Sequence, residues 1–202
     1  MFKMLSDTLR RFRHREDGNI AIETAIYLPF LLGVFAVTFT LFDLFRQETV
    51  NTKAAYTVSD LISRETTALN DEYINSIYTL GRMMARADSG MSMRVSVIRW
   101  DADDARYYVD WSVERGAQMD IWTDATVVDI EDKLPTMPDE ERIIVVETWN
   151  DVEPAFNVGL GTRNIYNLVF SRPRFASQIA FEGSVVSDGT IHDDEVVDNA
   201  ES

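Results

Sequence analysis

The chain has 202 residues, a net charge of −15 at pH 7, no cysteine and only two histidines. The acidic excess argues against nucleic-acid binding, because that affinity comes largely from Lys and Arg side chains that neutralise phosphates. Without cysteine the chain has no disulfide, no thiolate metal site and no cysteine nucleophile, and it also carries no phosphate-binding glycine loop and no nucleophile elbow. We therefore expect no metal, no cofactor, no catalytic residue and no small-molecule substrate, and the protein should not be an enzyme.

The chain begins with a short leader, residues 1–18, which is rich in Lys and Arg. An uncharged apolar run follows from Thr24 to Phe42. At about 1.5 Å per residue this run makes a helix of roughly 28 Å, close to the ~30 Å hydrocarbon thickness of a bilayer. We expect a transmembrane helix over residues 19–42. The basic leader then lies in the cytoplasm and the residues from Asp43 onward lie outside, which in a Gram-negative cell is the periplasm.

Glu23 and Pro29 are the unusual residues of this segment. A carboxylate at the bilayer centre costs about 2.5–3.5 kcal/mol on insertion scales, and less near the interface. Two interpretations of Glu23 are open: it is solvated among the lipid headgroups, or it pairs with an ammonium group and sets the register between packed helices. Pro29 removes one backbone hydrogen bond, and we expect a helix kink there.

The next residues, 43–182, predict a folded outer domain. Apolar residues continue at helical spacing to Ile62, so the first helix should extend beyond the membrane and pack on this domain. A second helix should begin after Asn70 or Asp71, either of which can cap it, and should end at Ser89-Gly90.

Alternation of apolar and polar residues with a period of two follows, and it predicts an antiparallel hairpin that turns at Asp101–Asp104. Strands are expected near 93–97, 107–113, 143–146 and 168–170, and a short helix near 124–134. The order of elements predicts an α+β fold with helices packed on one face of an antiparallel sheet. The acidic segment 183–202 is typical of a disordered tail.

Gly18-Asn-Ile-Ala-Ile-Glu23, followed by Ile26-Tyr-Leu-Pro-Phe-Leu-Leu32, resembles the start of the TadE/TadG-like proteins of tight-adherence (Tad) pilus systems. Those proteins carry a similar glycine, a glutamate five residues later, and a leucine–proline start to the membrane helix. A looser similarity extends through Val58–Glu65, Ile144–Trp149 and Ser171–Phe175, so it covers most of the chain. The length favours the small TadE type over the larger TadG type.

The resemblance implies a pilin-like fold and a minor-pilin-like (pseudopilin) component of a Tad pilus and secretion apparatus, in the bacterial inner membrane, with a role in cell adhesion. A prepilin peptidase would cut between Gly18 and Asn19, which leaves Glu23 as the fifth residue of the mature chain. The new ammonium group of Asn19 is then a partner for Glu23 of the same or a neighbouring subunit. The implied partners are this peptidase and other pilus subunits. Thr24 stands where processed members often carry an aromatic residue.

One other function stays open on these observations. The chain could remain uncut, as a single-pass envelope protein whose periplasmic domain scaffolds or binds another protein.

Overall fold

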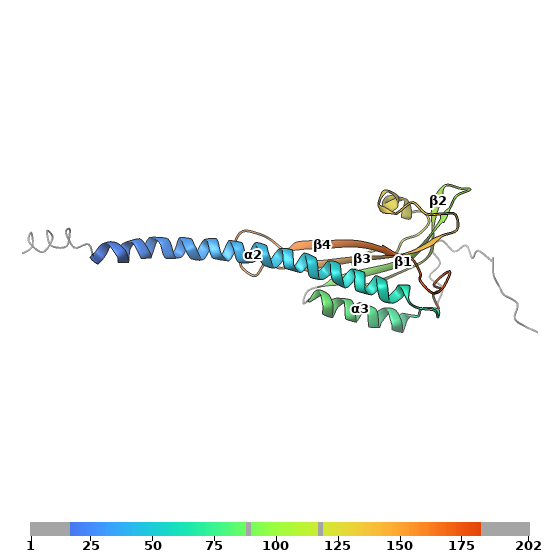
Figure 1. Cartoon of the computed structure of the whole chain (residues 1–202), viewed down its shortest axis with the longest axis horizontal. Helices are drawn as coiled ribbons and strands as arrows, with labels where there is room; N and C mark the ends of the chain where they lie inside the picture. The colour runs from blue at the N-terminus through green and yellow to red at the C-terminus, as the bar shows by residue number, and fades with distance from the viewer. Residues whose placement is uncertain (1–16, 88–89, 117–118, 183–202) are drawn as a thin grey trace, which may run out of the picture. The chain divides into compact units, whose positions relative to one another are not determined.

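The computed structural model describes residues 17–87, 90–116 and 119–182, so most of the expected leader and the whole expected tail, 183–202, lie outside the described residues. In chain order its elements are α2 (Asp17–Ser63), α3 (Asp71–Ala85), β1 (Met91–Asp101), β2 (Arg106–Arg115), the 3-10 helix η1 (Val127–Lys133), β3 (Arg142–Val152) and β4 (Arg163–Ser171) (Figure 1). They divide into two compact units. One unit contains α2 up to Phe45 together with residues 154–161 of the β3–β4 loop, and the other contains the remaining elements.

Helix α2 runs without interruption through Pro29. Of the described helices, only α2 is long and apolar enough to cross a membrane. Its large apolar side chains are exposed from Ile20 to Phe35, whereas Ala54, Ala55, Val58 and Ile62, beyond Arg46, are fully buried in the other unit. The predicted extension of the helix beyond the apolar run is therefore confirmed. The kink at Pro29 stays a prediction.

Helix α3 begins as predicted, because the Asn70 side chain accepts a hydrogen bond of 2.9 Å from the backbone N–H of Tyr73. The predicted end at Ser89-Gly90 is wrong, since the helix ends at Ala85. Arg86 takes a left-handed conformation, with φ of 52°, and its backbone N–H bonds to the carbonyls of the last turn. Strand β1 begins at Met91, six residues after the end of the helix.

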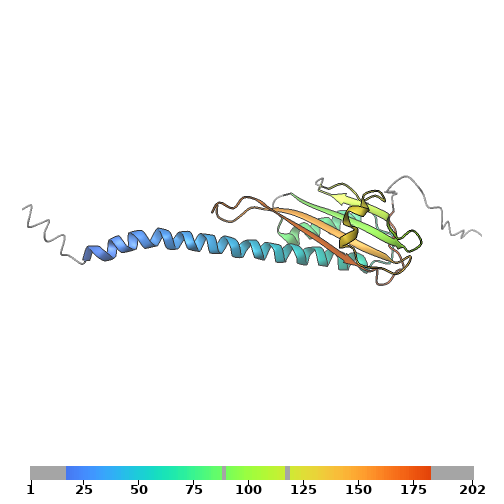
Figure 2. The same cartoon turned by 90° about the horizontal axis from the view of Figure 1, so that it is seen from above.

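The four strands form one antiparallel sheet in the order β2-β1-β3-β4 (Figure 2). The predicted hairpin of β1 and β2 is confirmed, and β3 is a central strand as its β-branched run predicted. A bulge in the β1–β2 pairing falls between Val97 and Ile98. On the outer strand β2, the backbone N–H of Val109 donates a hydrogen bond of 2.7 Å to the carboxylate of Asp124, from the segment that follows β2.

Both faces of the sheet are covered. Helices α2 and α3 cover one face, as predicted, through a core that includes Val58, Ile74 and Val95. Residues from 119 to 141, among them η1, cover the other face through a second core that includes Ile130 and Val145. The sequence predicted a short helix over 124–134, and the structure has a 3-10 helix over Val127–Lys133.

The second cover buries the polar side chains of β1. Met93, Val95 and Val97 alternate with Arg94 and Ser96, and all five side chains are buried. The polar members of the pattern face the segment of η1, so they must find their partners inside the protein.

Candidate functional site

The residues singled out for processing and assembly lie at the N-terminal end of the described part of α2. The backbone of Gly18 and Asn19 is helical there, and Glu23 follows about one turn further along the same helix. Gly18 and Glu23 are thus on one continuous segment, without a loop between them. Pro29 lies between these residues and the C-terminal half of the helix.

Glu23 lies on an apolar helix surface. Residues three and four positions away on a helix are its surface neighbours, and for Glu23 these include the exposed Ile20, Ile26 and Tyr27. The Glu23 side chain is itself exposed, and it has no ion pair among the side chains that the structure describes. A carboxylate in such surroundings gains most from a cationic partner outside this helix surface.

A buried polar cluster lies on the sheet face that η1 covers, and the sequence did not predict it. Arg94 of β1 and Glu147 of β3 stand directly opposite each other and are 5% and 1% exposed. The Arg94 Nε atom donates to Glu147 Oε2 at 2.7 Å, and the guanidinium carbon lies 3.9 Å from the centroid of the Trp122 ring. The guanidinium also donates to the backbone carbonyl of Asp120.

Two further donors complete the coordination of Glu147. Trp122 Nε1 donates to Oε2 at 2.6 Å, and the Tyr166 hydroxyl donates to Oε1 at 2.8 Å. Burial, and then the charge of Glu147, raise the pKa of Tyr166, so this hydroxyl stays protonated and keeps donating. With both ions paired and bonded, the cluster joins β1, β3, β4 and the segment before η1. We interpret it as structural, because its charges already satisfy each other.

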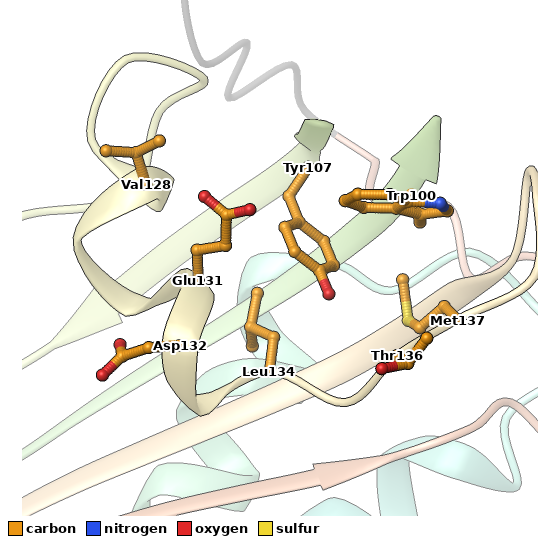
Figure 3. A pocket seen from close by; sticks show the side chains of 8 residues that line it. All are labelled: Trp100, Tyr107, Val128, Glu131, Asp132, Leu134, Thr136 and Met137. Atoms are coloured by element: carbon orange, nitrogen blue, oxygen red, sulfur yellow. The ribbon is translucent and has the colours of Figure 1, made fainter. Parts of the chain in front are cut away.

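A half-open groove of about 610 Å³ lies beside η1 (Figure 3). The Tyr107 ring lies at its centre, with Trp100 on one side, 4.6 Å away between ring centroids, and Glu131 on the other. The Tyr107 hydroxyl donates to the carbonyl of Pro135 at 3.0 Å, and burial raises its pKa. It is therefore a poor general base.

Asp101 and Asp104 of the β1–β2 turn accept hydrogen bonds from groups of the same hairpin. The Asp101 carboxylate accepts hydrogen bonds of 3.0 Å from the backbone N–H groups of Asp103 and Asp104, and Asp104 accepts one from the Tyr108 hydroxyl. Within the described residues no group of three or more His, Asp or Glu side chains is placed to hold a metal ion.

Comparison of the chain with models of known protein families, with curated proteins and with solved structures finds no match in any of the three. The function must therefore be inferred from the residues themselves and from their arrangement.

Proposed function

We propose that the chain is a membrane-anchored, minor-pilin-like (pseudopilin) subunit of a Tad-type pilus and secretion assembly apparatus. The observation that carries the proposal is the dual character of α2. One part of this helix exposes a long apolar surface, and the other part of the same helix is a core element of a domain with an antiparallel sheet. In this proposal the N-terminus is cytoplasmic, the inner membrane holds the apolar part, and the sheet domain is periplasmic.

The apolar part of α2 requires a non-aqueous environment. Soluble monomers rarely expose contiguous apolar patches larger than about a few hundred Å². The exposed apolar side chains on this stretch include Ile20, Ile22, Ile26, Leu28, Phe30, Leu31, Leu32, Val34 and Phe35. Lipid, and the apolar helices of neighbouring subunits, are the environments that bury such a surface.

Glu23 supports assembly over simple anchoring. A plain anchor gains nothing from a carboxylate within its apolar surface, and insertion of that carboxylate is unfavourable. Cleavage after Gly18 would create an ammonium group at Asn19, and a Glu23 carboxylate of a neighbouring subunit would pair with it in a medium of low dielectric. The pair would fix the axial register of adjacent helices. The mechanism is thus association, without a chemical step catalysed by this chain.

Processing is tested by the intact mass of the full-length protein after co-expression with a prepilin peptidase. We expect loss of residues 1–18 from the wild-type chain and their retention in Gly18→Ala. A wild-type chain that still carries its leader would instead favour the uncut envelope protein with a scaffolding domain.

The register function is tested with Glu23→Ala, and Glu48→Ala is the matched control, because Glu48 is an exposed glutamate of the same helix beyond the apolar run. Glu23→Ala should insert as well as the wild type, since a costly charge is removed. It should nevertheless lose cross-links between neighbouring subunits and reduce piliation, while Glu48→Ala keeps both. Normal piliation by Glu23→Ala would identify Glu23 as an ordinary interfacial carboxylate.

A further inference from the structure

We propose that residues 154–161 of the β3–β4 loop, the "loop foot", are a second membrane contact. In this inference the loop inserts the side chains of Phe156 and Leu160 into the interface of the outer leaflet, beside α2. The inference rests on the membrane anchoring proposed above and adds to it a contact made by the sheet domain's own hairpin.

The composition of the loop foot suits a lipid surface. No residue from Pro154 to Thr162 is charged, in a chain in which 26% of residues are charged. Phe156 is 45% exposed and Leu160 is 41% exposed. A Cβ built at Gly159 or at Gly161 would meet no atom within 4 Å, so the loop has open space around its backbone.

The position of the loop foot sets its level along α2. The Phe156 ring packs edge-on against the Phe39 ring, with 5.6 Å between the centroids, and the loop forms one compact unit with α2 up to Phe45. Phe39 belongs to the uncharged run and precedes Asp43 by four residues, which is about 6 Å along a helix. Thr40, the next residue, is fully buried.

The level of Phe156 follows from that contact. If the uncharged run spans the hydrocarbon, a ring beside Phe39 lies below the level of Asp43. This depth corresponds to the headgroup–acyl boundary, where amphipathic segments bury their apolar side chains by roughly 5–10 Å. The charged residues that flank the loop, Glu153 and Arg163, are exposed and mark where the hairpin returns to water.

Lipid is favoured over a protein partner because the loop foot has no charged group with which to select one. The rest of the chain is strongly acidic and would be repelled by anionic headgroups, so an uncharged apolar loop is the part of the hairpin suited to contact them. A second copy of the chain that covers the loop is an outcome of the test below.

The absence of cysteine makes the test direct, because each single-cysteine variant of the full chain carries one spin label. Three variants are reconstituted in phosphatidylcholine/phosphatidylglycerol vesicles: Leu160→Cys in the loop foot, Leu31→Cys in the apolar part of α2, and Thr79→Cys on the exposed face of α3. Collision of each label with oxygen, which partitions into lipid, is compared with collision with a water-soluble nickel chelate. We expect the oxygen-to-nickel ratio at Leu160→Cys to be severalfold that at Thr79→Cys.

Each of the other outcomes has a distinct meaning. If the oxygen-to-nickel ratio at Leu160→Cys equals that at Thr79→Cys while the Leu31→Cys label is in lipid, the loop does not contact lipid. The membrane anchor is then still supported. A loop label shielded from both reagents shows that protein, such as a second copy, covers the loop, and this also overturns the lipid contact. A Leu31→Cys label in water overturns the anchor and the inference together.

A second substitution separates insertion from packing. Adding Phe156→Asp to Leu160→Cys should move the loop label into water, because a carboxylate is unfavourable at this level. Adding Phe156→Asp to Leu31→Cys should leave the α2 label in lipid. Adding Phe156→Leu removes the aromatic contact with Phe39 but keeps the side chain apolar, and the loop label should stay in lipid. Equal oxygen-to-nickel ratios at Leu160→Cys in the Phe156→Asp and Phe156→Leu variants would contradict the inference.

Discussion

At the scale of single residues, Glu23 and Glu147 differ in how the charge of the carboxylate is compensated. Glu147 lies in a buried polar cluster, whereas Glu23 lies on an exposed apolar helix surface. Glu147 is 1% exposed and accepts hydrogen bonds from Arg94, Trp122 and Tyr166, so its charge is compensated inside the domain. Glu23 has no ion pair among the described side chains. A charge satisfied internally contributes to folding, whereas a charge left without a partner is available for association.

Removal of one member of the Arg94–Glu147 pair should be strongly destabilising. Arg94→Met leaves a buried carboxylate without its cation, which typically costs about 3–5 kcal/mol of unfolding free energy. The exposed pair of Arg64 and Asp60 gives the control, because Arg64→Met should cost at most about 1 kcal/mol. Thermal unfolding of the detergent-solubilised full chain, followed by circular dichroism, measures both.

The double variant Arg94→Met/Glu147→Leu tests whether the two residues act as a unit. It should be less destabilised than the sum of the two single variants, because it leaves no unpaired buried charge. Strictly additive losses would show that the two side chains contribute independently.

At the scale of elements, Gly81 lies where α3 packs close to Val58 of α2 and Met91 of β1. A Cβ built there lies 3.5 Å from Val58 Cγ2 and 3.8 Å from Met91 Cε, which are ordinary contact distances. Gly116, just after β2, is different. Its φ is +107°, and an added Cβ would overlap the backbone carbonyl oxygen of Met91.

Alanine at these two glycines should therefore change stability in opposite directions. Gly81→Ala fits its site and stiffens the unfolded chain, so it should stabilise the domain by about 0.4–1 kcal/mol. Gly116→Ala should destabilise it by more than that, because the backbone conformation and the space are both wrong for a side chain. The midpoint of thermal unfolding of each variant, compared with that of the wild type, measures these changes. A lower midpoint in Gly81→Ala would mean that α2 and α3 pack more tightly than these distances indicate.

The elements also show what the sequence can predict. Local signals were sufficient for the α2 continuation, the Asn70 cap, the β1–β2 hairpin and the central β3, because each depends on periodicity or on one side chain. The end of α3 was not predictable, since Arg86 adopts a left-handed conformation that glycine normally marks. Burial of Arg94 was missed because it depends on the strand register and on the cover by η1, and both are tertiary.

At the scale of the whole molecule, the proposed arrangement places the leader and the sheet domain on opposite sides of one membrane. Two single-cysteine variants test this topology: Ser6→Cys in the leader and Thr79→Cys in the sheet domain. Both are made in the Gly18→Ala background, which should retain the leader. In spheroplasts, a membrane-impermeant maleimide should modify Thr79→Cys at once, whereas Ser6→Cys should react only after lysis. The reverse pattern would invert the topology, and the cysteine-free wild type is the control for background labelling.

The hydrogen bond between Asp124 and the backbone of Val109 has a consequence for copies crowded in one membrane. An open outer strand is a template on which a strand of another molecule adds, and aggregation often starts there. Here a backbone donor of β2 is already occupied by the chain's own carboxylate. Growth of the sheet from one copy into the next is thus hindered at β2, so crowding there favours reversible side-chain contacts over irreversible sheet extension.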